Sequence, residues 1–331
     1  MMMDTPNAAP RGPDGREPWG RAVPATAVLL ASSQIALAQP LTERVEHAVE
    51  IPRNARISIM NFAGHVEVHG TDPGEDSTLR VIGVKRLEAE LPAEEAERIF
   101  EQVNLDLRRR GRRIHIGPNR PRSDRHRPAE RTSGERRGPP PVTPPVTEVR
   151  PPRRIPPVSG GLEVWLPDGA SLEVRTFTAP ITIAGIGAPD GDFLLRSVSG
   201  PIEIRDLEAD DLRAETVSGN LTLADVRAHR GSFMTLTAPI RVTGALQLDG
   251  WYEFQTHSGA VLLGLGSLAG FTVAATTYSG EIRSELEFEA ERDSRSLEGR
   301  HGSGGPQISV STFGGSIHLA PEAAAIRNVE R

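Results

Sequence analysis

The chain has 331 residues, a formal net charge of −6, 37% hydrophobic residues and only 4% aromatic residues. It has no cysteine, which excludes disulfide bonds, thiolate catalysis, thiolate metal sites and a lipid-modified N-terminal cysteine. Because aromatic side chains are so scarce, any hydrophobic core must consist mainly of Val, Ile, Leu and Ala.

Residues 1–38 have the features of a secretory signal peptide. A polar, arginine-containing lead is followed by a mildly apolar run that ends Ala36-Leu37-Ala38, the A-x-A pattern of a cleavage site. The run contains Pro24 and is too short for a permanent membrane span. The alternative is an alanine-rich, disordered N-terminus. We therefore predict an exported chain that is not transmembrane and lies in the periplasm, in the cell envelope or outside the cell.

Residues 39–116 predict a small β-rich unit with one helix. Apolar residues alternate on both sides of the turn at 61–64 and again over 79–84, as in half-buried strands. Pro92 is typical of a helix start, and the apolar residues that follow it have helical spacing: Ala93, Ala96, Ile99, Phe100 and Val103. A hairpin is expected around Gly111. Such a unit would cap the open edge of a repeat array.

Residues 117–157 predict a disordered linker rich in Arg and Pro. They lie largely within a basic block, residues 108–154, which holds 15 Arg against four acidic residues, a local balance of +11. Almost no large apolar side chain is present, so this segment cannot bury enough surface to offset the entropy of ordering. A solvated insertion is the simplest interpretation. The alternative is contact with an anionic surface such as lipopolysaccharide.

Residues 158–321 contain a short phrase that recurs with variations. Its copies are Thr176-Phe177-Thr178-Ala179, Ser197-Val198-Ser199-Gly200, Thr216-Val217-Ser218-Gly219, Thr235-Leu236-Thr237-Ala238, Thr256-His257-Ser258-Gly259, Thr277-Tyr278-Ser279-Gly280 and Thr312-Phe313-Gly314-Gly315. In the first six copies, the Ala or Gly recurs at intervals of 21, 19, 19, 21 and 21 residues. Such a period predicts an all-β fold of the β-solenoid or β-helix type, with stacked repeats of about 20 residues. The polar stretch 289–306 is expected to be a flexible loop, and 322–331 a tail.

The alternation of apolar residues assigns faces to the residues of each copy. The first Ser or Thr of the phrase shares parity with the apolar residues before it, so we expect an inward-facing row beside the turn. This inner row comprises Thr176, Ser197, Thr216, Thr235, Thr256, Thr277 and Thr312. Stacked hydroxyls there can satisfy backbone groups of the turn. The Ala or Gly that closes each copy would permit a tight bend or a positive φ.

The opposite parity predicts a row of side chains on the outer face. This outer row comprises Phe177, Val198, Val217, Leu236, His257, Tyr278 and Phe313. A contiguous exposed apolar stripe marks a partner surface in many proteins, so these residues are the candidate binding site. The alternatives are a bulge at the turn, which would bury the row, or the N-terminal helix, which would cover it.

The segment Thr216-Val217-Ser218-Gly219-Asn220-Leu221-Thr222-Leu223, repeated after an exported N-terminus, resembles the bacterial putative-adhesin domain family. That family is related to the toast-rack domains of cell-envelope stress proteins. The segment Asn61-Phe62-Ala63-Gly64-His65-Val66-Glu67-Val68 resembles it as well. The resemblance covers residues 45–320, interrupted by the Arg/Pro segment. It implies a β-helix-like fold and an envelope location, and it supplies no catalytic residues.

Two groups of residues were candidates for chemistry. Enzymes of the β-helix type that act on polysaccharides need clustered carboxylates or a metal with a base. Four acids here lie near successive turns, in contexts that indicate solvated loops: Asp206, Asp210, Asp211 and Asp225. His65, Glu67 and His69 share one strand face, where two of them could hold a metal, but a solvated polar face is the simpler interpretation. We predict no cofactor and no metal.

The sequence contains no Gly-rich phosphate loop and no nucleophile–His–acid set in a recognisable context. Nucleic-acid binding would rest only on the Arg-rich linker, and an exported protein rarely meets nucleic acid. We therefore predict a non-catalytic, exported envelope protein that acts as an adhesin-like binding module or scaffold, with an envelope component or a protein as partner. The first alternative is partner docking in envelope-stress signalling, and the second is a polysaccharide-acting enzyme.

Overall fold

The computed structural model describes residues 42–71, 77–87, 100, 104–119, 158–265, 270–287, 289–293 and 295–322. The predicted signal peptide and most of the predicted linker and tail lie outside the described residues. Of the predicted helix, residues 92–103, only Phe100 is described, so this helix is not seen. Within the described part of the chain, no helix is long and apolar enough to cross a membrane.

The described chain is almost entirely β-structure, arranged as one open sheet of twenty strands. The strands before the Arg/Pro segment are β1 (Thr42–Glu50), β2 (Arg56–Asn61), β3 (Gly64–Gly70), β4 (Thr78–Leu87), β5 (Asn104–Arg110) and β6 (Arg113–Asn119). The strands after it are β7 (Val158–Leu166), β8 (Ser171–Thr176), β9 (Ile181–Ser197), β10 (Ile202–Thr216), β11 (Leu221–Thr235), β12 (Ile240–Thr243), β13 (Trp251–Thr256), β14 (Val261–Gly264), β15 (Gly270–Thr277), β16 (Ile282–Ser284), β17 (Glu289–Arg292), β18 (Ser296–Gly302), β19 (Gln307–Thr312) and β20 (Ile317–Ala320).

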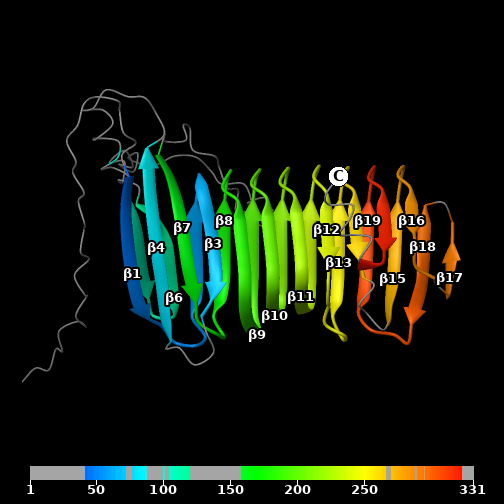
Figure 1. The fold of residues 1–331 in the computed structure, drawn as a ribbon, viewed down its shortest axis with the longest axis horizontal. Helices are drawn as coiled ribbons and strands as arrows, with labels where there is room; N and C mark the ends of the chain where they lie inside the picture. Colours follow the sequence, from blue (N-terminus) through cyan, green and yellow to red (C-terminus); the bar gives the residue numbers. More distant parts are fainter. Residues whose placement is uncertain are drawn as a thin grey trace, which may run out of the picture.

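The strands follow one another along one long axis, from β1 and β4 at one end to β17 and β18 at the other (Figure 1). Two runs of neighbouring strands pass through the long strands β9, β10 and β11. One run is β1-β4-β7-β3-β9-β10-β11-β12-β14-β20-β16. The other is β5-β6-β2-β8-β9-β10-β11-β13-β19-β15-β18-β17.

The recurring phrases stack in parallel register. The first apolar residue after each turn pairs with its counterpart in the next copy, in the order Ile181, Ile202, Leu221, Ile240, Val261, Ile317 and Ile282. The last copy in the sequence therefore lies between the fifth and the sixth, because β19 pairs with both β13 and β15. At the other end, β3 lies between β7 and β9, so strands from before and after the Arg/Pro segment pair directly.

The core follows the predicted alternation. Ile57, Ile59, Val66 and Val68 are all buried, and they belong to the same continuous hydrophobic cluster as the strands after residue 158. The few aromatic residues occupy a large share of the core. Phe193, Phe233, Tyr252, Phe254 and Phe271 are among the largest fully buried side chains. The Phe233 and Phe254 rings stack with centroids 5.1 Å apart.

The predicted hairpin around Gly111 is confirmed. Strands β5 and β6 pair in antiparallel register, and Gly111 adopts a φ of 60° at the turn between them. The first five arginines of the basic block, Arg108 to Arg113 without Gly111, therefore lie on an ordered hairpin rather than in a disordered linker. Strand β6 also extends to Asn119, so it includes the first three residues of the segment 117–157, for which disorder is predicted.

The prediction of a flexible loop over residues 289–306 is wrong. This stretch forms β17 and β18, which pair in antiparallel register, and β18 also pairs with β15. Leu297 is buried, and the ring of His301 lies 5.2 Å from that of Phe271. The polar sequence is explained by its place at the end of the sheet, where one face is exposed to solvent and an antiparallel ribbon covers the edge of the parallel stack.

The inner row is confirmed. All seven of its Ser and Thr residues are buried, and Asn61 occupies the corresponding place in the N-terminal turn. Where Gly closes the copy, its N–H donates to the Thr hydroxyl, as from Gly259 to Thr256 at 2.8 Å. Where Ala precedes Pro, the hydroxyl donates to the Ala carbonyl instead, as from Thr176 to Ala179 at 2.8 Å. The inner row therefore satisfies backbone groups that the tight turn leaves unpaired.

The glycines of the phrase are required by close approach and not by a positive φ. A Cβ on Gly219 would lie 2.1 Å from the carbonyl oxygen of Gly200, and one on Gly259 would lie 1.9 Å from that of Ala238. Positive φ instead occurs at the second bend of the first four copies, where Gly185, Asp206, Asp225 and Gly244 have φ values of 65°, 50°, 53° and 83°. Aspartate tolerates this left-handed conformation better than most residues do.

Gly219→Ala should therefore destabilise the fold. The new methyl group would overlap the Gly200 carbonyl, and we expect the free energy of unfolding to fall by about 2 kcal/mol or more. Gly187→Ala is the matched control, because its Cβ would meet only a carboxylate oxygen of Asp168, at 3.9 Å. Urea unfolding followed by circular dichroism measures both. An equal effect of the two substitutions would contradict the close-approach account.

Tyr252 ties three segments together through one buried hydroxyl. Its oxygen accepts hydrogen bonds from the backbone N–H groups of Ala228, at 3.0 Å, and Gln247, at 2.9 Å. Burial raises the pKa of this phenol above its ordinary value of 10.0, although the two backbone donors act in the opposite direction. Nearby Asp249 adds a smaller upward contribution.

A raised folded-state pKa means that the stability from neutral Tyr252 is fully present below pH 10 and is lost as pH rises through that pKa. We expect Tyr252→Phe to lower the free energy of unfolding at neutral pH by about 2 kcal/mol, because a buried N–H group and a part-buried one lose their acceptor. The variant should also lose less further stability above pH 10 than the parent protein. Urea unfolding across pH 7–11 tests this, and parallel pH curves for both proteins would contradict it.

Candidate functional site

The outer row lies on the surface along successive turns of the stack. Val217, Leu236, Phe313 and Tyr278 are 45%, 48%, 50% and 65% exposed. His257 is also exposed, whereas Phe177 and Val198 are half-buried. The residues that the sequence assigned to this row are therefore brought together on one face, and no bulge buries them.

Backbone hydrogen bonds between the turns fix the spacing of the row. The N–H of Val217 donates to the carbonyl of Val198 at 3.2 Å, and that of Leu236 donates to the carbonyl of Val217 at 3.2 Å. His257 is bonded to Leu236 in the same way. Neighbouring members therefore lie one strand spacing apart, about 4.8 Å, on a backbone that cannot slide locally without losing these bonds.

Three rings form a stacked ladder at one end of the outer row. The Phe313 ring lies between those of His257 and Tyr278, with centroid distances of 5.0 and 4.7 Å and interplanar angles of 9° and 12°. This order departs from the sequence order, because the last copy is inserted between the fifth and sixth. Stacked aromatic pairs add to stability beyond their buried area, so the ladder makes this end of the row rigid.

Phe62 is a further member of the row, which the repeated phrase did not identify. The N–H of Thr178 donates to the carbonyl of Phe62 at 3.1 Å, so Phe62 extends the row by one turn beyond Phe177. The signal was present in Asn61-Phe62-Ala63-Gly64, which has the polar, apolar, small pattern of the other copies. It was assigned to a separate unit because more than a hundred residues separate it from Phe177.

The four aspartates that are candidates for catalysis are distributed over two sets of bends. Asp210 and Asp211 both lie near Arg230 of the next copy, at 3.4 and 3.5 Å. Asp225 accepts a hydrogen bond from the N–H of Ala245 at 3.0 Å. Asp206 lies with Asp225 in a hollow of about 240 Å³. Most of these carboxylates therefore have structural partners, and the four side chains do not meet at one reaction centre.

His65, Glu67 and His69 share one face of β3, as the alternation predicts. His69 lies beside Trp165, with ring centroids 5.6 Å apart, and its Nε2 is 3.9 Å from the Glu67 carboxylate. Within the described residues, no group of three or more His, Asp or Glu side chains is placed to hold a metal ion. The geometry therefore resembles a solvated polar face.

Comparison with known proteins gives no family model and no curated protein that matches the chain. Among solved structures, the chain is similar to a "putative lipid binding protein" from Parabacteroides distasonis, at 14% identity and a TM-score of 0.36, covering 85% of this chain and 97% of that one. It is also similar to a "putative adhesin" from Bacteroides fragilis, at 9% identity and a TM-score of 0.32, covering 86% and 98%.

A "putative cell adhesion protein" from Clostridium sporogenes is a further similar structure, at 9% identity and a TM-score of 0.30, covering 86% of this chain and all of that one. These names include the adhesin family that the repeated phrase resembles, and none of the three is the name of an enzyme. With TM-scores of 0.36 or less, the superpositions carry no argument about the fold or the ligand.

Proposed function

We propose that this protein is a non-catalytic, exported component of the cell envelope that binds an envelope component through the outer row. In this proposal the repeated copies are the coils of a β-solenoid, and the solenoid is a rigid scaffold that displays one side chain per coil. The observation that carries the proposal is the row itself, which is largely apolar, continuous from Phe62 to Tyr278, and exposed from Val217 onward.

The apolar composition of the row favours binding to a partner. Exposed apolar side chains scattered singly are ordinary on protein surfaces, but a contiguous series is a feature of interaction sites. Val217, Leu236 and Phe313 each leave about half of their surface in water, and burying them against a partner would stabilise the complex.

The scaffold adds a second reason. The turns that carry the row are hydrogen-bonded to one another, and their inner hydroxyls are satisfied within the protein. A partner would therefore meet side chains that are already ordered, and binding would cost little conformational entropy. This arrangement supports recognition by a preformed surface rather than by a segment that folds on binding.

The test compares two triple variants of the mature chain, residues 39–331, in co-sedimentation with peptidoglycan, outer-membrane vesicles and whole cells. One variant carries Val217→Ser, Leu236→Ser and Phe313→Ser. We expect it to bind the recognised fraction at least about tenfold more weakly than the parent, because each substitution removes an apolar contact.

The control variant carries Leu248→Ser, Trp251→Ser and Met234→Ser, which remove apolar side chains that are 66%, 42% and 46% exposed outside the row. It should bind as the parent does. Equal loss in both variants, or undiminished binding by the row variant, would contradict the proposal. Absence of binding to every fraction would also overturn it and favour a protein partner, as in envelope-stress signalling.

A further inference from the structure

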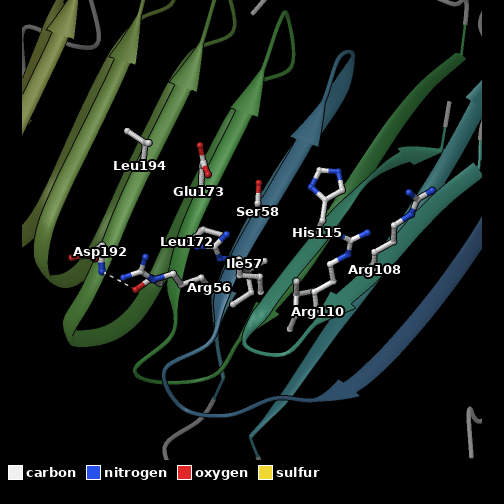
Figure 2. A pocket seen from close by; sticks show the side chains of 13 residues that line it. Arg56, Ile57, Ser58, Arg108, Arg110, His115, Leu172, Glu173, Asp192 and Leu194 are labelled. Atoms are coloured by element: carbon white, nitrogen blue, oxygen red, sulfur yellow. Dashed lines mark hydrogen bonds between the residues drawn. The ribbon is translucent and has the colours of Figure 1, made fainter. Parts of the chain in front are cut away.

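A groove of about 640 Å³ crosses the outer face of β5, β6, β2, β8 and β9 near the N-terminal end of the stack. Figure 2 shows Arg108 and Arg110 of β5 and His115 of β6 along one part of it, with Arg56 of β2 farther along the groove. Asp192 of β9 lies at the other side, close to Arg56 in the view. No residue of the outer row lines this groove.

The strand register places three arginines in one lateral line. Arg110 is paired with Arg113 across the β5–β6 hairpin, and Arg113 is paired with Arg56 on the neighbouring strand β2. These three residues, here called the arginine row, are all exposed. The line continues to Ser171, which is paired with Arg56 on β8. Three guanidinium groups thus start from adjacent strands, about 4.8 Å apart.

The arginine row lacks the acidic partners that several other arginines of the sheet have. Arg175 donates to Glu173 at 2.7 Å, and Arg196 donates to Glu215 at 2.9 Å. Within the described part of the chain, none of the three residues of the row forms an ion pair. Like charges on directly opposed strand positions are destabilising. A bound anion would remove this repulsion.

The other side of the groove has a different chemistry. Ser58 and Ser171 are short side chains that leave space above the strands, and Glu173 and Asp192 supply carboxylates. The N–H of Asp192 donates to the Ser171 hydroxyl at 3.2 Å. Carboxylates accept hydrogen bonds from sugar hydroxyls, and serine hydroxyls both donate and accept them. The carboxylates repel a ligand that is anionic along its entire length.

We propose that this groove binds an acidic polysaccharide. The arginine row would hold carboxylate groups of the sugar chain by charge-assisted hydrogen bonds, for which the guanidinium fork is suited. Ser58, Ser171 and Asp192 would contact the hydroxyl groups of the adjoining sugars. The charge distribution of the groove favours a ligand with separated acidic groups and many hydroxyls over polyphosphate or a membrane surface.

This site goes beyond the function proposed for the outer row and does not depend on it. Arg56 begins β2, whereas Phe62 of the outer row follows the end of that strand. Six extended residues separate them, about 20 Å. One site can therefore be removed while the other remains.

The test is isothermal titration of the full chain with oligomers of hyaluronan, a linear chain in which acidic and neutral sugars alternate, at low salt. Arg56→Gln and Arg113→Gln should each weaken binding by about tenfold, since each removes one charged hydrogen-bond donor. Arg227→Gln, an exposed arginine of β11 outside the groove, is the control with the same change in net charge. It should alter the affinity less than about twofold.

Two further measurements separate the site from general electrostatics and from misfolding. The melting temperatures of Arg56→Gln and Arg113→Gln should equal or exceed that of the parent, because each substitution relieves repulsion within the row. Neutral dextran, polyphosphate and vesicles of anionic phospholipid are the alternative probes. An equal loss in Arg227→Gln, absence of hyaluronan binding, or tighter groove-dependent binding of polyphosphate or vesicles would overturn the proposal.

Discussion

The structure depends on how closely the turns of neighbouring copies approach one another where glycine closes the copy. A carbonyl oxygen of one copy occupies the space that a Cβ would need at Gly200, Gly219, Gly259, Gly280 and Gly315. This contact holds the copies in one register, and the same register buries the inner hydroxyls and aligns the outer row. Even the line of three arginines at the N-terminal end follows from strands that keep equal positions across the sheet.

Much of this arrangement could be predicted from the sequence, because strand alternation is a local property. Leu212 and Ala214 share parity with Thr216, so burial of the first two predicts burial of the third, and the structure confirms it. The same parity predicted that Val217 and Leu236 would be exposed. The repeated phrase also identified which residues would meet in space, since equal positions in stacked repeats become neighbours.

The remaining features depend on pairings between distant segments, for which a local pattern contains no signal. Nothing around Gln307 indicates that β19 inserts between β13 and β15, and nothing around Arg56 indicates that Arg113 lies beside it. The polar composition of β18 predicted a loop because its antiparallel partner, β15, could not be recognised from the sequence. The groove was missed for the same reason: its basic residues belong to the predicted N-terminal unit, whereas Ser171, Glu173 and Asp192 on its other side belong to the predicted repeat array.

The most direct test of the in-register stack uses the absence of native cysteines. A disulfide requires Cα atoms about 4.4–6.8 Å apart, which fits adjacent copies but not copies separated by another strand. Oxidation of a variant with His257→Cys and Phe313→Cys should form an intramolecular disulfide, whereas His257→Cys with Tyr278→Cys should not. Mass spectrometry after alkylation measures both. Efficient cross-linking of the second pair, without the first, would contradict the order of the copies and the register on which the account rests.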